Sequence, residues 1–154
     1  MFVWVDPWIR TVWFAMLDAK KAIVTAWIIK QTQTNDLERL DEIFTFFDEL
    51  FTKHSPVSLT IEKLFFTERN KQKAWLVFTM RYMIMMLAYR HNITIYEISP
   101  LELKKHITGN GRAEKQLVKQ VVQRLFGLQD LPAYADAADA LWLALIGAGK
   151  KTGG

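Results

Sequence analysis

Short apolar runs separated by polar breaks make up the first 30 residues of the chain. Phe2–Val5 is an apolar run that stops at Asp6 and Pro7, which is typical of a buried strand ending in a turn. Thr11–Leu17 and Ala22–Lys30 are two further β-prone runs, and the polar stretch between them is short enough for a hairpin. The pattern therefore predicts three antiparallel strands at the start of the chain.

The apolar period then alternates between that of helices and that of strands. In Asn35–Lys53 apolar side chains recur three or four residues apart, with acidic residues on the other face, which predicts a helix. Val57–Ile61 predicts a fourth strand with Glu62 at its exit, and Ile93–Ile98 predicts a fifth. Between these two strands, Asn70–Arg90 predicts a long helix with little polar surface.

Helices and turns are predicted for the last third of the chain. Pro100–His106 predicts a short helix and Gly109–Gly111 a turn. Arg112–Phe126 is amphipathic and predicts a helix that ends at a glycine. Ala135–Ile146 predicts the final helix.

This order of elements predicts an α/β fold, in which a mixed five-stranded sheet is flanked by helices. The chain has 154 residues, of which 51% are hydrophobic and 23% charged, and these values are typical of one globular domain. We expect residues 1–148 to form this single domain and residues 149–154 to be a flexible tail.

Composition excludes several kinds of chemistry. The absence of cysteine excludes disulfides, zinc–thiolate sites and thiol nucleophiles. No apolar run approaches the roughly 20 residues that span a bilayer, and the N-terminus does not resemble a signal peptide. We therefore expect a soluble, cytoplasmic protein with no membrane contact. The net charge of +4 favours a polyanionic partner only if the basic residues cluster.

Four carboxylates occur where elements end or begin. Asp6 ends the first predicted strand, Glu62 ends the fourth, and Asp136 and Asp139 share one face at the start of the last helix. Carboxylates that lie together repel one another unless a cation neutralises them, and oxygen ligands favour Mg²⁺ or Mn²⁺ over zinc. The alternative is structural: Asp6 only forms a turn, and the run around Asp136 only caps a helix.

Basic residues do cluster in one short stretch of the sequence. Three of them are predicted to share a helix face opposite Leu117, Val118, Val121, Val122 and Leu125. Such a surface binds phosphates with a salt-dependent affinity, whereas the alternative interpretation is an ordinary solvated helix face. The predicted nucleic-acid surface consists of Lys104, Lys105, Arg112, Lys115 and Lys119, the last three being those on the helix face.

Four sequence blocks together resemble the RuvC family of Holliday-junction resolvases. Their order and spacing agree with that family from about Met1 to Ile146, and the pair GNGRAEK and DAADAL is fairly specific. The blocks are WVDPW at Trp4–Trp8, TIEKLFF at Thr60–Phe66, LKKHITGNGRAEK at Leu103–Lys115 and ADAADAL at Ala135–Leu141.

The resemblance implies an RNase H-like fold and a Mg²⁺-dependent endonuclease that cuts four-way DNA junctions as a homodimer. Phe65 matches the aromatic residue that wedges against bases, while Lys104 and Lys115 match lysines that contact the scissile region and the backbone. The long helix 70–90 would supply the dimer contact, and a branch-migration motor is a further candidate partner. The matching catalytic and metal-binding acids are Asp6, Glu62, Asp136 and Asp139.

Tryptophans depart from the family pattern. Five of the six stand where the family usually or often has glycine, and an indole at position 8 could obstruct the approach to Asp6. One explanation is a genuine variant that binds junctions but cuts poorly. We hypothesise instead that UGA codons for glycine have been read as tryptophan, because drift should not favour one residue type at glycine sites. These positions are Trp4, Trp8, Trp13, Trp27 and Trp142.

A third interpretation is another RNase H-like nuclease, such as the type that processes pre-ribosomal RNA. The DAADAL and GNGRAEK blocks argue against it.

Overall fold

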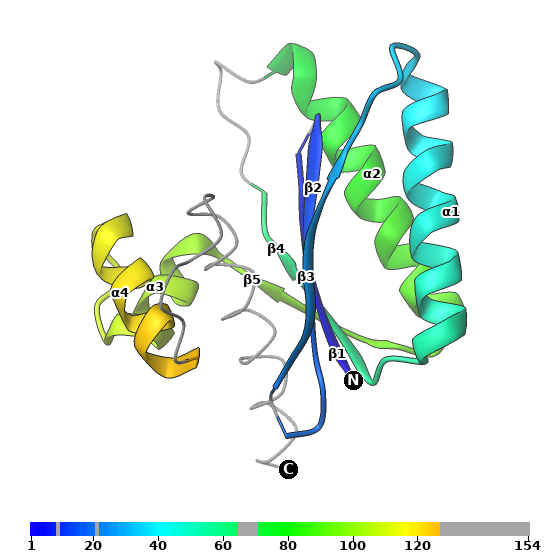
Figure 1. The fold of residues 1–154 in the computed structure, drawn as a ribbon. Coiled ribbons are helices and arrows are strands. Elements are labelled where there is room, and N and C mark those ends of the chain that lie inside the picture. The colour runs from blue at the N-terminus through cyan, green and yellow to red at the C-terminus, as the bar shows by residue number, and fades with distance from the viewer. Residues whose placement is uncertain (9, 21, 65–70, 127–154) are drawn as a thin grey trace.

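The computed structural model describes residues 1–8, 10–20, 22–64 and 71–126, and within them five strands form one sheet (Figure 1). The strand order is β3-β2-β1-β4-β5. β1 pairs antiparallel with β2, as β2 does with β3, whereas β1 pairs parallel with β4, as β4 does with β5. This confirms the predicted mixed α/β sheet. The strands are β1 (Phe2–Pro7), β2 (Thr11–Leu17), β3 (Ile23–Lys30), β4 (Ser58–Glu62) and β5 (Thr94–Ile98).

Different helices cover the two faces of the sheet, as Figure 1 shows. One pair lies on one side and the other pair on the opposite side, next to the end of β5. Because side chains alternate along a strand, Val3 and Val5 face the first pair while Trp4 faces the second. The first pair is α1 (Asp36–His54) and α2 (Lys71–Arg90), and the second is α3 (Pro100–Thr108) and α4 (Lys115–Phe126).

The α1–α2 side holds the larger apolar core. Phe47 of α1 is fully buried, and its ring meets those of Phe14 and Phe46 edge-on, with centroids 6.1 and 5.2 Å away. Met80 and Ile84 of α2 complete this layer against the sheet. Edge-to-face aromatic contacts add about 0.5–1.5 kcal/mol each beyond the area that they bury, so this cluster anchors both helices to the sheet.

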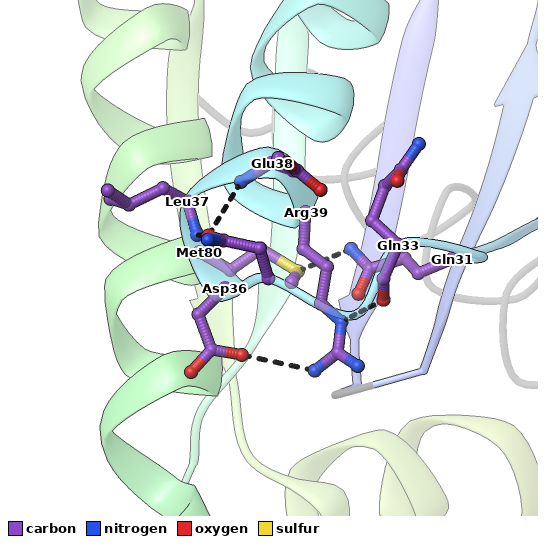
Figure 2. A network of polar contacts seen from close by, with 8 residues as sticks. Gln31, Gln33, Asp36, Leu37, Glu38, Arg39 and Met80 are labelled. Carbon is purple, nitrogen blue, oxygen red and sulfur yellow. Dashed lines mark hydrogen bonds and ion pairs between the residues drawn. The ribbon is translucent and has the colours of Figure 1, made fainter.

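Polar contacts define where α1 begins (Figure 2). The Asn35 side chain accepts hydrogen bonds from two backbone amides of the first turn, at 2.8 and 3.5 Å. Arg39 Nε donates to the carbonyl of Gln33 at 2.7 Å, which holds the incoming chain against the helix. Gln31 Nε2 lies 4.0 Å from the sulfur of Met80, so the exit of β3 also contacts α2.

Most predicted boundaries are within two residues of those observed, and two of the differences concern the site. β1 continues through Asp6 to Pro7, because these residues still pair with β2 after pairing with β4 has ended at Val5. The predicted helix Arg112–Phe126 begins only at Lys115. Residues 111–112 form a turn instead, closed by a hydrogen bond of 3.0 Å from the amide of Ala113 to the carbonyl of Asn110.

Arg112 therefore does not share a helix face with Lys115 and Lys119, and that part of the prediction is wrong. Leu117, expected on the apolar face of this helix, is exposed, whereas Val118 is buried. The predicted helix 135–146 and the predicted tail 149–154 lie outside the described residues. Within the described part of the chain, no helix is long and apolar enough to cross a membrane.

Candidate metal centre

Asp6 and Glu62 end two neighbouring parallel strands at the same level. The last register pair of β1 and β4 is Val5 with Ile61, so each acid directly follows that pair. Alternation places both side chains on the α3–α4 face, opposite to Val5. Neighbouring strands lie about 4.8 Å apart, so the fold makes these two carboxylates neighbours, as the sequence predicted on the condition that the strands adjoin.

The two carboxylates differ in their exposure to solvent. Asp6 is only 8% exposed, whereas Glu62 at the open end of β4 is partly exposed. Asp6 also lies opposite the buried Trp13 of β2. Burying an ionised carboxylate is costly unless hydrogen bonds or cations compensate for the lost water. The position of Asp6 is thus one that a cation would stabilise.

Trp8 contacts the Asp6 carboxylate directly. Its indole Nε1 donates a hydrogen bond of 2.9 Å to Asp6 Oδ2. The amide of Trp8 donates to the carbonyl of Thr11 at 2.9 Å, which fixes its backbone at the β1–β2 turn. Sequence reasoning anticipated only an obstruction at this position, not a hydrogen bond to the acid.

Arg81 of α2 holds the backbone at Glu62. Its guanidinium is almost completely buried, with Nε donating to the Glu62 carbonyl at 3.1 Å and Nη2 forming an ion pair with the Glu97 carboxylate of β5. One side chain thus joins α2 to the ends of β4 and β5. Sequence reasoning assigned this arginine no role, although a charge in so apolar a helix must find partners if it is buried.

Beneath the carboxylates, the α3–α4 face contains buried polar atoms. Ser58 Oγ, Thr60 Oγ1 and Trp4 Nε1 have no hydrogen-bond partner among the residues that the structure describes. Thr60 and Trp4 are register partners on β4 and β1. Each such group costs about 1–3 kcal/mol relative to one with a hydrogen-bond partner, so these atoms lower the stability that this face contributes.

The described residues supply two of the four carboxylates predicted to bind Mg²⁺. Carboxylate oxygens are the ligands that this hard cation prefers, and two of them lie together at the strand ends. Within residues 1–126, leaving out the short gaps, no group of three acidic or histidine side chains could hold a metal. Asp136 and Asp139, the other two predicted ligands, lie outside the described residues.

Basic residues lie on elements that cover the same face. Lys105 of α3 and Arg112 of the following turn are exposed, and Lys104 is partly exposed. Lys115 and Lys119 are four residues apart in α4. The elements that carry the basic segment therefore cover the face of the sheet on which the two carboxylates are placed. Phe65 lies outside the described residues.

Glycine at position 111 allows the close approach that this basic turn requires. A Cβ there would lie 3.0 Å from the Leu101 side chain and 3.1 Å from its carbonyl oxygen. A larger residue would push the turn that carries Arg112 away from α3.

Known proteins share both the fold and the sequence of this chain. The fold matches the Thermus thermophilus RuvC structure with a TM-score of 0.80, 24% identity and 98% and 96% of the two chains covered. The structure of T. thermophilus RuvC in complex with Holliday junction substrate matches with a TM-score of 0.82, 22% identity and 99% and 97% coverage. The fold is therefore of the RNase H-like class found in resolvases.

The family described as crossover junction endodeoxyribonuclease RuvC matches residues 2–147. The protein of that name from Gloeobacter violaceus is 34% identical over 147 residues, covering 92% of this chain and 84% of its own length. That from Caldicellulosiruptor saccharolyticus is 31% identical over 146 residues, with 92% and 87% covered. The chain belongs to the crossover junction endodeoxyribonuclease RuvC family.

Proposed function

We propose that this protein is a structure-selective endonuclease that cleaves four-way (Holliday) DNA junctions by metal-assisted phosphodiester hydrolysis. The observation that carries the proposal is that Asp6 and Glu62 directly follow the last register pair of β1 and β4, on the face covered by the elements that bear the basic segment. Its relatives are named crossover junction endodeoxyribonucleases, and one structural neighbour is described in complex with Holliday junction substrate. The activity would serve recombination and repair in the cytoplasm.

Asp6, Glu62, Asp136 and Asp139 would hold Mg²⁺, for which Mn²⁺ would substitute. The bound metal would supply a water of lowered pKa for attack on phosphorus and would stabilise charge on the leaving 3′ oxygen. The chain itself does the positioning. β1 keeps the Asp6 carboxylate largely out of water, and Arg81 holds the backbone at Glu62.

The remaining predicted residues would bind DNA. Phosphates would be contacted by the basic segment, and each neutralised phosphate adds a salt-dependent increment to affinity. Phe65 would stack on bases near the junction centre, a contact worth about 1–3 kcal/mol per base. The proposed DNA-contacting residues are Phe65, Lys104, Lys105, Arg112, Lys115 and Lys119.

The direct test is cleavage of a synthetic four-way junction. We expect symmetric cuts in two strands with Mg²⁺, no cuts with a chelator, and little cleavage of a linear duplex of the same sequences. A preference for an RNA substrate over the junction would contradict the proposal.

A second candidate function is junction binding without cleavage, favoured by the hydrogen bond between Trp8 and Asp6. Binding of the junction with no cuts in either Mg²⁺ or Mn²⁺ would support this candidate over the first.

We also propose that the protein is a homodimer formed through α2. Trp75, Tyr82, Met86 and Tyr89 of this helix are all exposed, and their spacing of seven, four and three residues places them along one stripe. Aromatic and methionine side chains are enriched at protein interfaces. Two copies facing each other would cover this stripe and present two metal sites to one junction.

Sedimentation or light scattering should report a dimer for the native chain and a monomer for Tyr82→Glu. Trp27→Glu, which changes an exposed tryptophan on β3, is the matched control and should remain dimeric. A native chain that is monomeric at micromolar concentration would contradict the dimer proposal.

A further inference from the structure

The indole of Trp8 lies against the acid that we assign to the metal. Its N–H donates to Asp6 Oδ2 over 2.9 Å, while the other end of the residue is fixed by the backbone hydrogen bond to Thr11. The side chain is 54% exposed, so core packing does not lock the ring in place. Releasing the ring from Asp6 would therefore cost little packing energy.

We infer that Trp8 is a built-in competitor of the metal ion at Asp6. This inference rests on the proposed function, because it assumes that Asp6 is a metal ligand. Mg²⁺ requires its oxygen ligands at about 2.0–2.1 Å in near-octahedral geometry and keeps several waters. An indole that donates to Oδ2 uses one of the carboxylate's lone pairs and occupies space next to Oδ2 that the hydrated ion needs. Cation binding then requires the hydrogen bond to break and the ring to swing outward.

Two consequences follow for a chain that carries tryptophan at position 8. Its metal affinity is lower than that of the same site without the indole N–H, since a hydrogen bond to a charged group must first be lost. Metal binding also moves Trp8 from the carboxylate into solvent, which makes its side chain a reporter of occupancy. The alternative is that the hydrogen bond from Trp8 orients Asp6 for the metal. In that case, removing the indole N–H would lower the metal affinity.

Calorimetric titration with Mn²⁺ distinguishes these roles. Trp8→Phe keeps an aromatic ring but removes the donor, and we expect it to bind Mn²⁺ about tenfold more tightly than the native chain. Trp8→Gly removes the ring as well, and its Mn²⁺ affinity should rise by at least the same factor. Trp27→Phe is the matched control, because Trp27 is also exposed but lies on β3 away from the carboxylates, and its affinity should be unchanged.

Asp6→Asn in the same titration separates failure of the inference from failure of the proposed site. If Asp6→Asn binds Mn²⁺ as well as the native chain, the metal site itself is misassigned. If Asp6→Asn loses binding but Trp8→Phe binds equally or more weakly than the native chain, the site stands and the competitor role is overturned.

A measurement on the native chain avoids any dependence on how a variant folds. In a ¹⁵N-correlated NMR spectrum, the indole N–H signal of Trp8 can be assigned through contacts to its own backbone. Saturating Mg²⁺ should shift it upfield and speed its exchange with water, while the Trp27 signal stays in place. A Trp8 signal that does not change while Mg²⁺ binds would overturn the inference.

Discussion

The two faces of the central sheet differ in polarity. On the α1–α2 side, Val3, Val5 and Phe47 belong to a continuous apolar cluster in which the residues nearest the sheet are fully buried. On the α3–α4 side, Asp6, Glu62 and the buried hydroxyl of Thr60 interrupt the apolar surface. The first face supplies packing energy, while the second keeps polar groups that cost stability where they are buried and that include the carboxylates of the proposed metal site.

Adjacent residues of the same strands serve both faces. Val5 and Asp6 are neighbours in sequence but point to opposite sides, because the side-chain period of a strand is two. A slip of one residue in the register would exchange the two faces completely. The apolar cluster therefore also holds the carboxylates in place, by fixing the register of β1 and β4.

The largest expected effect comes from the chemical face. Asp6→Asn removes a ligand charge but keeps the shape of the side chain, so we expect junction cleavage to fall at least about a hundredfold. Gel-shift affinity for the junction in Ca²⁺ or without metal should be largely retained. Glu62→Gln should behave in the same way. Normal cleavage by Asp6→Asn would show that the site is misassigned.

The apolar face should instead respond in stability. Phe47→Ala deletes a fully buried ring, and we expect the free energy of unfolding to fall by about 3–5 kcal/mol. Phe44→Ala on the same helix is the control, because Phe44 is partly exposed and should cost much less. Both values come from urea unfolding. If Phe47→Ala also weakened Mn²⁺ binding in the folded protein, the two faces would not be separable.

Opposite exchanges on the two faces, polar to apolar on one and apolar to polar on the other, should have smaller effects on stability. Thr60→Val removes a buried hydroxyl without a described partner and should stabilise the fold by about 1 kcal/mol. Val3→Thr introduces a hydroxyl into the apolar cluster and should destabilise it by about 1–3 kcal/mol. Equal and unfavourable effects of both changes would mean that Thr60 has a partner that compensates its burial.

The smallest effect is expected at the basic surface. Lys105→Ala should weaken junction binding a few-fold and lower the slope of log K against log salt by about one unit, because one phosphate contact is lost. Lys53→Ala, an exposed lysine at the end of α1, should leave both quantities unchanged. An unchanged salt slope for Lys105→Ala would exclude a direct phosphate contact.

Sequence patterns predicted the elements well wherever local signals were strong. Strand β2 has the predicted bounds, and α1 begins one residue after its predicted start. Gly111 was correctly predicted to lie in a turn, but Arg112 was assigned to the helix, because its spacing matches the period of the helix that follows. The geometry of this turn depends on Gly111 packing closely on Leu101, a contact between segments that periodicity does not reveal.

In the candidate site, too, local patterns predicted some features, while others depend on tertiary contacts. Asp6 and Glu62 were identified from their places at strand ends, and the structure makes them neighbours through the parallel pairing of β1 with β4. The hydrogen bond from Trp8 and the anchoring of Glu62 by Arg81 were not predicted. Both depend on how a side chain folds back or reaches across elements, which the spacing along the chain leaves open.

What the sequence by itself determined is the order of the elements up to Phe126 and the family, because local periodicity and short motifs carry that information. Only the tertiary structure decided which strands adjoin and which face each carboxylate shares. It also decided that an indole rests on Asp6 and that a buried arginine of α2 holds Glu62. The physical reason is that these arrangements come from sheet register and helix packing, which join residues distant in sequence through contacts that no local pattern encodes.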